Sequence, residues 1–556
     1  MRQLQNLFRN RALFLIWLIF VCKGLFYCAI FPVWEGFDEY AHFAFIQHLD
    51  TYKSLPLPET RVSKEIEQSL ANVPLPWSLK KWEPPHVTHD AYWQLPAEER
   101  ARREQEFQSI PIGGLSEQRE NFLYEGTQGP LYYLLMAPLY HVVRDFELPT
   151  RVFLFRLLNI LIGSAIIPIA FVTARKVFPD PRLAVGVCAV IAAMPGIYID
   201  GSRVGNQTLA MVEYGLLTWF CLIALRDNRK YFLPAGLILG MLLVTKAYGL
   251  AAIPAVGVVG LEIVWKTPSK RIQNTFLVIA SFCLAAGISG WWFLRNLRLA
   301  GAIIWVGGAP SEDLSYLEII RRTSEVHWSQ LVRSLLDSHT WVGNWSFLSL
   351  RSWMYHTFNY WVLLIIAGIV ILVVRQFRRV ELKNSISLPS LLILVLLWGG
   401  FLLSLLYHGM VNFLNEGVGA SAGWYIYAVI VPEGILIIAG LSAFRFSRGL
   451  ILGLVACSIL LEVYASHWIL IPYYVGLIRH TVSGALQSFH PEKMGIGIFQ
   501  LLTRLTVNRP PFLTGTVLVG IWVAYLSATI GLFFVALKNL REPHPYRPSG
   551  GKGEPG

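Results

Sequence analysis

The sequence predicts an all-α polytopic membrane protein with about 12 transmembrane helices. Of its 556 residues, 54% are hydrophobic and 15% are charged, whereas soluble globular chains carry about 25% charged residues. Apolar runs of about 20 residues, the length that crosses a bilayer, recur along the chain. Basic residues gather in alternate connections between these runs, as the positive-inside rule requires. A soluble globular fold is therefore excluded.

The first span follows a basic N-terminus that contains Arg2, Arg9 and Arg11. Its apolar stretch is about 20 residues long and lacks a small-residue cleavage site, so we expect an uncleaved span. The expected spans are 12–32, 153–173, 183–202, 207–225, 232–248, 249–265, 273–293, 355–374, 386–407, 424–444, 449–471 and 514–537. We expect 129–143 to lie along the outer interface, because a span there would put the basic connection 174–182 on the wrong side.

In this arrangement every cytoplasmic connection carries positive charge, which places both termini in the cytoplasm and the long connections outside. The expected regions are 1–32, the N-terminus and first span; 33–152, a large extracytoplasmic loop; 153–293, a transmembrane core; 294–354, a second outer loop; 355–537, a C-terminal transmembrane region with outer loops; and 538–556, a disordered cytoplasmic tail. Dense aromatic residues in the outer loops predict that these loops are ordered.

The net charge of +12 does not indicate nucleic-acid binding, because the basic residues are scattered in short clusters between apolar runs. All six cysteines lie inside apolar runs and none forms a C-x-x-C pair. The cysteines therefore indicate neither a disulfide framework nor a structural zinc site.

An acidic run, "FDEYAHFAFIQHLD" (37–50), directly follows the first span. If this run is helical, Asp38 and Glu39 share a face with His42, at spacings of four and three residues. A carboxylate held at the membrane boundary suits a general base that takes a proton from a hydroxyl. The same trio could bind a divalent cation, or the run could be a solvated acidic loop. The residues alone leave these three hypotheses open.

Further polar residues are expected at the outer ends of other spans, where they could surround one cavity. They are Tyr132, Arg203, Asn206, Lys246, Arg295 and Asn296. Cations in such a cavity could stabilise a phosphate leaving group. Taken singly, Arg295 after two tryptophans is typical of an interface anchor, and Lys246 is typical of a snorkelling lysine. Lys23 lies deep in the first span, where an intramembrane charge is a functional candidate, although snorkelling is the simpler expectation.

Five stretches occur in a recognisable order: "FDEYAH", "QGPLYY", "GNQ", "VTKAYG" and "WWFLRN". In series they resemble the GT-C superfamily of membrane glycosyltransferases that use polyprenyl-phosphate-linked sugars. The nearest resemblance is to the aminoarabinose and protein-mannosyl transferase group and to bacterial membrane proteins with a "PDEPAHF"-like first loop. The resemblance covers roughly residues 12–300, and beyond that it extends only to the architecture.

This resemblance implies an inverting glycosyltransferase of a bacterial plasma membrane, active on the extracytoplasmic face. The implied partners are a polyprenyl-phosphate sugar donor, a glycan, lipid or protein acceptor, and membrane lipid. Asp38 takes the position of the catalytic acid, with Glu39 and His42 beside it. No cofactor is implied with certainty, and a divalent cation stays open.

The sequence departs from the family pattern at three places. Asn206 stands where an acid is usual, Gln128 and Gly129 replace a lysine and a proline, and Trp424 occupies a usual arginine position. These departures keep a non-catalytic GT-C-like scaffold as an alternative. A lipid-linked sugar transporter or flippase is the other alternative, but it should show interrupted spans or repeated halves, and we expect neither here.

Overall fold

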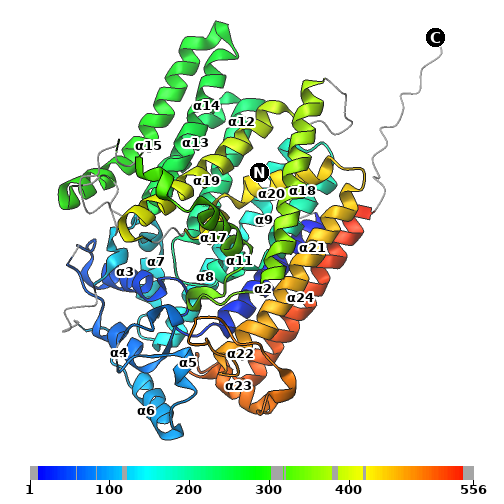
Figure 1. Ribbon diagram of the computed structural model, residues 1–556. Coiled ribbons are helices and arrows are strands. Elements are labelled where there is room, and N and C mark those ends of the chain that lie inside the picture. The colour runs from blue at the N-terminus through cyan, green and yellow to red at the C-terminus, as the bar shows by residue number, and fades with distance from the viewer. Residues whose placement is uncertain are drawn as a thin grey trace.

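The computed structural model describes residues 10–57, 59–82, 84–114, 122–301, 303, 317, 321–378, 386–417 and 421–541. Within these ranges the protein is a helical bundle, as the sequence predicts (Figure 1). The described part contains one small sheet, in which β1 (Pro74–Leu75) pairs in parallel with β2 (Val87–Thr88).

The N-terminal half contains α2 (Arg11–Ile30), α3 (Glu39–Tyr52), α4 (Lys64–Asn72), α5 (His89–Tyr92), α6 (Ala97–Gln108), α7 (Leu131–Val143), α8 (Leu148–Ser164), α9 (Ile166–Val177), α10 (Pro181–Ala193), α11 (Pro195–Gly201), α12 (Gln207–Arg226), α13 (Phe232–Thr245), α14 (Ile253–Trp265) and α15 (Arg271–Ala300). The C-terminal half contains α17 (Trp328–Thr340), α18 (Ser352–Phe377), α19 (Leu388–Glu416), α20 (Ile430–Ser442), α21 (Ser447–Tyr464), a π-helical segment (Ala465–Leu470), α22 (Ile471–Tyr474), α23 (Ile498–Thr506) and α24 (Gly515–Arg541).

Ten helices in the described residues are long and apolar enough to cross a membrane, and an eleventh span is formed if α10 and α11 are taken together. The chain is therefore an integral multi-pass membrane protein. α10 and α11 meet at an angle of 60°, because Pro195 removes a helical donor and its ring clashes with the preceding turn. The expectation that no span is interrupted was wrong at this point.

Twelve spans were expected and up to eleven are found in the described residues. The expected span that is missing is 232–248. Its helix, α13, has 14 residues, about 21 Å at 1.5 Å per residue, which is shorter than a hydrocarbon core of about 30 Å. The connection to α14 is a 3₁₀ helix, Ala247–Ala252, that begins directly after Lys246. The stretch 129–143 forms α7, which is too short to count as a span.

Local sequence explains where several spans begin and end. Asn10 accepts hydrogen bonds from the first-turn N–H groups of α2, and Asp180 caps α10 in the same way. α15 and α19 each end at a glycine in the left-handed region, Gly301 and Gly417. Glycine is favoured there because it has no Cβ to clash.

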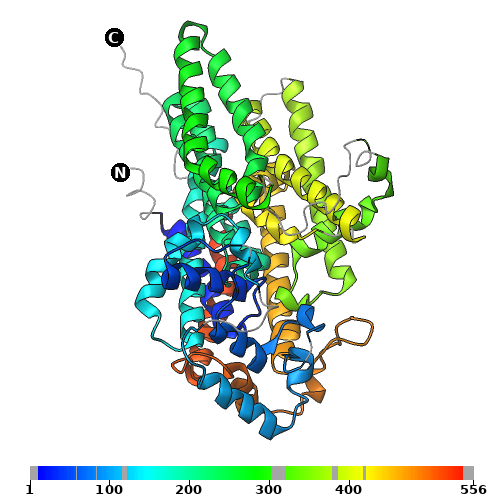
Figure 2. The ribbon, with the colours of Figure 1, turned by 90° about the vertical axis from the view of Figure 1, so that its left-hand side faces the viewer.

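The core forms around α2, which packs against α8, α10 and α24. α18 lies on the outside of this bundle, where most of its side chains face the surroundings, as a lipid-facing span should. α4, α5, α6, α22 and α23 gather at one end of the bundle (Figures 1 and 2). Two long segments, 33–130 and 471–514, therefore meet at that end.

Lys23 does not snorkel to an interface. Its Nζ lies 2.6 Å from Glu462 Oε2 of α21, and both side chains are fully buried. The ammonium also donates to the Ala192 carbonyl at 2.7 Å and lies 4.4 Å from the centre of the Tyr198 ring. Lys23 therefore ties α2 to two other spans, and the snorkelling expectation was wrong because Glu462 supplies a buried counter-ion.

Several expectations fall partly outside the described residues. The outer loop 294–354 is described except for 302, 304–316 and 318–320, and the N-terminus is described from residue 10. The tail expected to be disordered from 538 onward begins as helix, because α24 continues to Arg541. Residues 542–556 lie outside the described residues.

Candidate active site

Asp38 stands at the junction between the first span and α3. It is the residue before α3 and has a left-handed backbone, with φ 55° and ψ 17°. Its carbonyl accepts the N–H groups of Ala41 and His42 at 3.0 Å each, while its carboxylate makes no capping bond to α3. A positive φ is uncommon for a residue with a side chain, and such strain is concentrated at functional sites. The turn leaves the Asp38 carboxylate available for another partner.

That carboxylate receives a hydrogen bond from a second segment. The Tyr124 hydroxyl donates to Asp38 Oδ1 at 2.8 Å. Tyr124 begins a 3₁₀ turn, Tyr124–Thr127, that leads into α7. The half-buried Asp38 is thus positioned from two sides, by its own turn and by Tyr124.

Glu125, the next residue in this turn, brings a second carboxyl group to the site. Its side chain is buried, and Oε2 lies 3.7 Å from His42 Nδ1 without a hydrogen-bond partner. Burial and the neighbouring negative charge of Asp38 raise the pKa of Glu125 to about 8. At neutral pH Glu125 therefore carries a proton and can donate a hydrogen bond.

His42 faces this pair from the first turn of α3. Its Nδ1 lies 2.7 Å from the Tyr133 hydroxyl of α7. Burial holds the pKa of the His42 imidazole well below its usual range, and the positive charges of Arg203 and Lys246 lower it further. His42 is therefore neutral and polar rather than a cation.

Arg203 approaches from the connection between α11 and α12. Its Nε and Nη2 donate to Asp200 Oδ1 at 2.9 and 2.6 Å, and its Nη1 donates to the Phe37 carbonyl at 2.8 Å. A Cβ on Gly36 would lie 2.5 Å from Arg203 Cβ, and one on Gly205 would lie 2.6 Å from Arg203 Nη1. Two glycines are thus required for the close approach of Arg203 to the residue before Asp38.

Lys246 contributes the second cation. It is buried, and its Nζ donates to Gln207 Oε1 at 3.3 Å. The ammonium lies 5.2 Å from the centre of the Tyr248 ring and 5.1 Å from that of Tyr425. Within the described residues no carboxylate forms an ion pair with Lys246, so its charge remains available for an anionic ligand.

Asn206 and Tyr132 line the same region but are largely satisfied by the protein. Asn206 Nδ2 donates to the Thr245 carbonyl and to Gln128 Oε1, whereas its Oδ1 is buried without a partner. The Tyr132 hydroxyl donates to Asn159 at 3.0 Å and accepts the Gly205 N–H at 3.2 Å. Tyr132 therefore fixes the backbone beside Arg203.

Glu39 is paired inside the fold. Arg156 of α8 donates to both Glu39 oxygens, at 2.7 and 2.5 Å, and the Val204 N–H donates to Oε1 at 3.0 Å. The structure therefore separates Glu39 from Asp38 and His42. Among the described residues, no group of three or more His, Cys, Asp or Glu side chains is placed to hold a metal ion.

Arg295 and Asn296 lie in the last turns of α15, and Arg295 contacts the site region through Pro56. Arg295 Nη2 donates to the Pro56 carbonyl at 2.6 Å, and the guanidinium lies 4.9 Å from the centre of the Trp292 ring. Its Nη1 and the Asn296 Oδ1 are buried without partners. Pro56 in turn packs close to Gly126, directly after Glu125.

Trp424 replaces the arginine that the resemblance led us to expect. Its ring stacks on Phe37 with centroids 4.1 Å apart and an interplanar angle of 9°. Phe37 and Trp424 therefore form an aromatic surface beside Asp38, where a cation was expected.

Two residues of the site, Glu125 and Gln207, were not among the residues expected from the sequence. Glu125 lies three residues before "QGPLYY", and an acid next to Tyr124 at that place was the available signal. Nothing local to Gln207 indicates that it binds Lys246, which is 39 residues away.

No protein-family model and no curated protein matches the chain. Among solved structures it is similar to ArnT from Cupriavidus metallidurans bound to undecaprenyl phosphate, with 14% identity, a TM-score of 0.41, and coverage of 97% of this chain and 74% of that one. It is also similar to the arabinosyltransferase EmbB from Mycobacterium smegmatis, with 13% identity, a TM-score of 0.38, and coverage of 75% and 36%. A third similar structure is the Archaeoglobus fulgidus oligosaccharyltransferase tethered with an acceptor peptide, with 13% identity, a TM-score of 0.31, and coverage of 90% of this chain and 54% of that one.

These likenesses are distant in both sequence and superposition.

Proposed function

We propose that this protein is an inverting glycosyltransferase that moves a sugar from a polyprenyl-phosphate carrier to an acceptor hydroxyl on the extracytoplasmic face of a bacterial plasma membrane. One observation carries the proposal. Asp38, whose carboxylate is not neutralised by an ion pair among the described residues, sits in a strained turn at the end of the first span, close to Glu125 and Lys246. The five ordered motifs of the sequence support the same reaction class.

In the proposed reaction Asp38 takes the proton of the acceptor hydroxyl as that oxygen attacks the anomeric carbon. The bond between the anomeric carbon and the phosphate oxygen breaks, and polyprenyl phosphate leaves with the bonding electron pair. A single displacement from the opposite face inverts the configuration, as in base-assisted inverting glycosidases. General-base catalysis of this kind contributes about 10² to 10⁴ in rate.

The leaving phosphate needs positive charge at the boundary between lipid and water. Lys246 suits this role because its side-chain partners, Gln207 and two tyrosine rings, do not neutralise it. Arg203 is oriented by Asp200 and adds to the positive potential. Arg295 has one buried Nη1 without a partner and could hold a more distant phosphate oxygen.

The remaining candidates position these groups. Glu39 locks the start of α3 to α8 through Arg156, and His42 holds Tyr133 and faces Glu125. Protonated Glu125 can donate to a sugar hydroxyl, because burial keeps its proton on at neutral pH. Trp424 and Phe37 offer flat apolar surface for one face of the sugar.

The test is a transfer assay in membranes that contain the protein and a labelled polyprenyl-phosphate sugar pool. The expected result is a glycosylated product with inverted anomeric configuration, formed by the wild type and not by Asp38→Asn. A scaffold would yield no product from the wild type. A flippase would move the labelled lipid across the bilayer and leave it unreacted. Either outcome would refute the proposal.

A further inference from the structure

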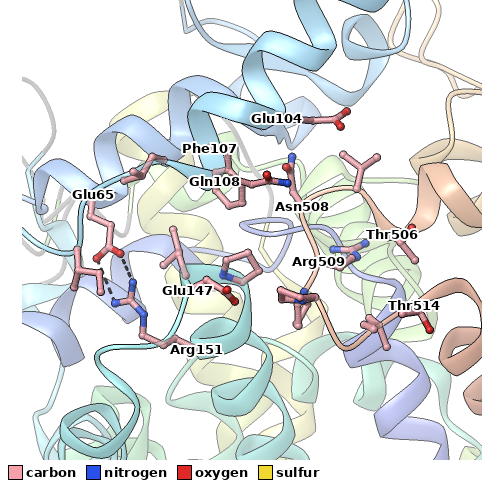
Figure 3. Close-up of a pocket in the computed structure, with 18 of the residues that line it drawn as sticks. Glu65, Glu104, Phe107, Gln108, Glu147, Arg151, Thr506, Asn508, Arg509 and Thr514 are labelled. Atoms are coloured by element: carbon pink, nitrogen blue, oxygen red, sulfur yellow. Dashed lines mark hydrogen bonds and ion pairs between the residues drawn. The ribbon is translucent and has the colours of Figure 1, made fainter.

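A cavity of about 860 Å³ opens at the end of the bundle, away from the Asp38 site (Figure 3). Segments far apart in sequence form it: Glu65 of α4, the second half of α6 with Ile110 and Ile112 after it, the start of α8 with the residues before it, and 503–514 from the end of α23 to α24. α8 and α24 are spans that begin here. Neither Asp38 nor its neighbours line the cavity, which therefore lies at a separate place on the membrane boundary.

The spans supply an apolar side to this cavity. Leu148 at the start of α8 and Leu513 just before α24 line it and are buried. Phe146 and Phe512 lie beside them and are about half exposed, at 50% and 49%. Phe512 packs edge-on against Phe153 of α8, with centroids 5.5 Å apart. These half-exposed apolar rings at the start of two spans extend the apolar side of the cavity to the surface of the bundle.

A cation and orphaned polar atoms line the middle of the cavity. Arg509 donates only to main-chain carbonyls, those of Ile30, Phe31 and Leu505, and within the described residues no carboxylate pairs with it. Both amide atoms of its neighbour Asn508 are buried without a partner, and Asn508 has a left-handed φ of 56°.

A fully buried arginine, Arg151, also has a donor without a partner beside this cavity. Arg151 pairs with Glu65, as Figure 3 shows, but its Nε has no partner. Buried donors without partners are rare in folded proteins. Together with Arg509, they indicate a ligand with several acceptor oxygens, such as a phosphate.

Acidic groups complete the lining. Glu104 of α6 accepts a hydrogen bond from the Tyr92 hydroxyl at 3.3 Å, and no arginine or lysine of the described chain forms an ion pair with it. Glu147 accepts the Thr150 hydroxyl at 3.4 Å, and no cation among the described residues forms an ion pair with it. Figure 3 shows Asn508 and Arg509 between Glu104 on one side and Glu147 on the other. Glu104 belongs to α6, the element farthest from the spans (Figure 1).

We infer that this cavity binds the phosphoethanolamine head group of a membrane phospholipid. Its phosphate lies against Arg509 and Asn508, its ammonium donates to Glu104, and its acyl chains run past Leu148 and Leu513. Glu104 lies on one side of Asn508 and Arg509, and the start of α8, with Glu147 and Leu148, lies on the other. An ammonium at Glu104, a phosphate at Arg509 and acyl chains at Leu148 would therefore follow the order of these groups in such a lipid. A choline head group has no N–H to donate to Glu104, and a purely anionic head group would meet that carboxylate unfavourably.

The test uses the full-length protein in nanodiscs that hold phosphatidylethanolamine, phosphatidylcholine and phosphatidylglycerol in equal parts. Lipids retained after transfer to detergent are counted by native mass spectrometry. We expect selective retention of phosphatidylethanolamine, lowered about tenfold in Glu104→Gln through loss of one charge-assisted hydrogen bond. Asn508→Gly keeps the left-handed backbone, removes the amide and should lower retention too. Glu98→Gln, an exposed change on the same helix, is the matched control.

Equal retention of the three lipids by the wild type would overturn the inference. So would selective retention that Glu104→Gln and Asn508→Gly leave unchanged. A last arm adds soluble O-phosphoethanolamine. Binding of this soluble compound without retention of any lipid would show a site for a water-soluble ligand and would overturn the assignment to a membrane lipid.

Discussion

The ion pair of Lys23 and Glu462 within the spans and the centre around Asp38 both hold charge away from bulk water, but they balance it differently. Lys23 and Glu462 satisfy each other at 2.6 Å, with further contacts to Ala192 and Tyr198. Around Asp38 the direct contacts are a tyrosine hydroxyl for Asp38 and an amide for Lys246.

This difference separates charges that hold the fold from charges that can act on a ligand. A buried pair with all its hydrogen bonds is costly to break because one ion is left behind. An unpaired charge at a boundary is costly to keep, and such groups mark functional sites. The substitutions below test whether the two regions respond in opposite ways.

The largest stability loss is expected at the membrane pair. Lys23→Met leaves Glu462 buried without a counter-ion, which should destabilise the protein by roughly 3–5 kcal/mol. The double variant Lys23→Met, Glu462→Met should regain most of that loss. The measurement is thermal unfolding of the purified protein, with transfer per folded molecule as the second readout. If the single variant is as stable as the double variant, Lys23 and Glu462 do not form a stabilising pair.

Lys246→Met should change donor binding rather than stability. No carboxylate of the described residues pairs with Lys246, so removing its ammonium should leave thermal stability near that of the wild type and weaken donor binding about tenfold or more. Lys230→Met is the matched control, because Lys230 is exposed and follows the far end of α12. Donor affinity measured with a short-chain polyprenyl-phosphate sugar decides the matter. Equal affinities for the two variants would remove Lys246 from the phosphate site.

A smaller effect is expected at α15. Arg295→Ala should weaken donor binding by roughly two- to tenfold, the range for one hydrogen bond, because its buried Nη1 is free for an oxygen. Arg298→Ala, one turn further along and exposed, should have no effect. If both variants bind the donor alike, Arg295 only anchors the helix at the interface.

The smallest effect is a dependence of stability on pH. The pKa of Glu125 is raised from 4.5 to about 8 in the folded protein, so its contribution to stability is present below pH 4.5 and is lost as pH rises through about 8. The pKa of His42 is lowered, so its contribution changes only below pH 6.5. Between pH 6.5 and 8.5 the wild type should therefore lose more thermal stability than Glu125→Gln. Parallel pH profiles would show that Glu125 is already ionised at neutral pH.

Much of the fold could be predicted, because a span requires about 20 apolar residues in succession and that requirement is visible locally. The exceptions are places where tertiary contacts decide. α13 is too short for a span, and it packs extensively against α15. The break between α10 and α11 did have a local signal, since a proline at position 195 interrupts the apolar run.

The site was predictable only where the chain itself brings groups together. Asp38 directly precedes α3 and His42 lies in its first turn, so their proximity follows from spacing. Glu39 also lies in that turn, but it pairs with Arg156, 117 residues away. Nothing in the sequence near residue 39 indicates that partner. Two adjacent acids, Asp38 and Glu39, therefore differ in role because their partners, Tyr124 and Arg156, come from distant parts of the chain.

The most direct measurement compares Asp38→Asn with Glu39→Gln in both turnover and thermal stability. Asn tolerates the left-handed turn but lacks the basic oxygen, so Asp38→Asn should stay as stable as the wild type while turnover falls by about 10² or more. Glu39→Gln should lose stability, because Arg156 remains buried without its carboxylate, and should keep measurable turnover per folded molecule. Near-full transfer by a stably folded Asp38→Asn would contradict the account, and the base would then have to be sought elsewhere.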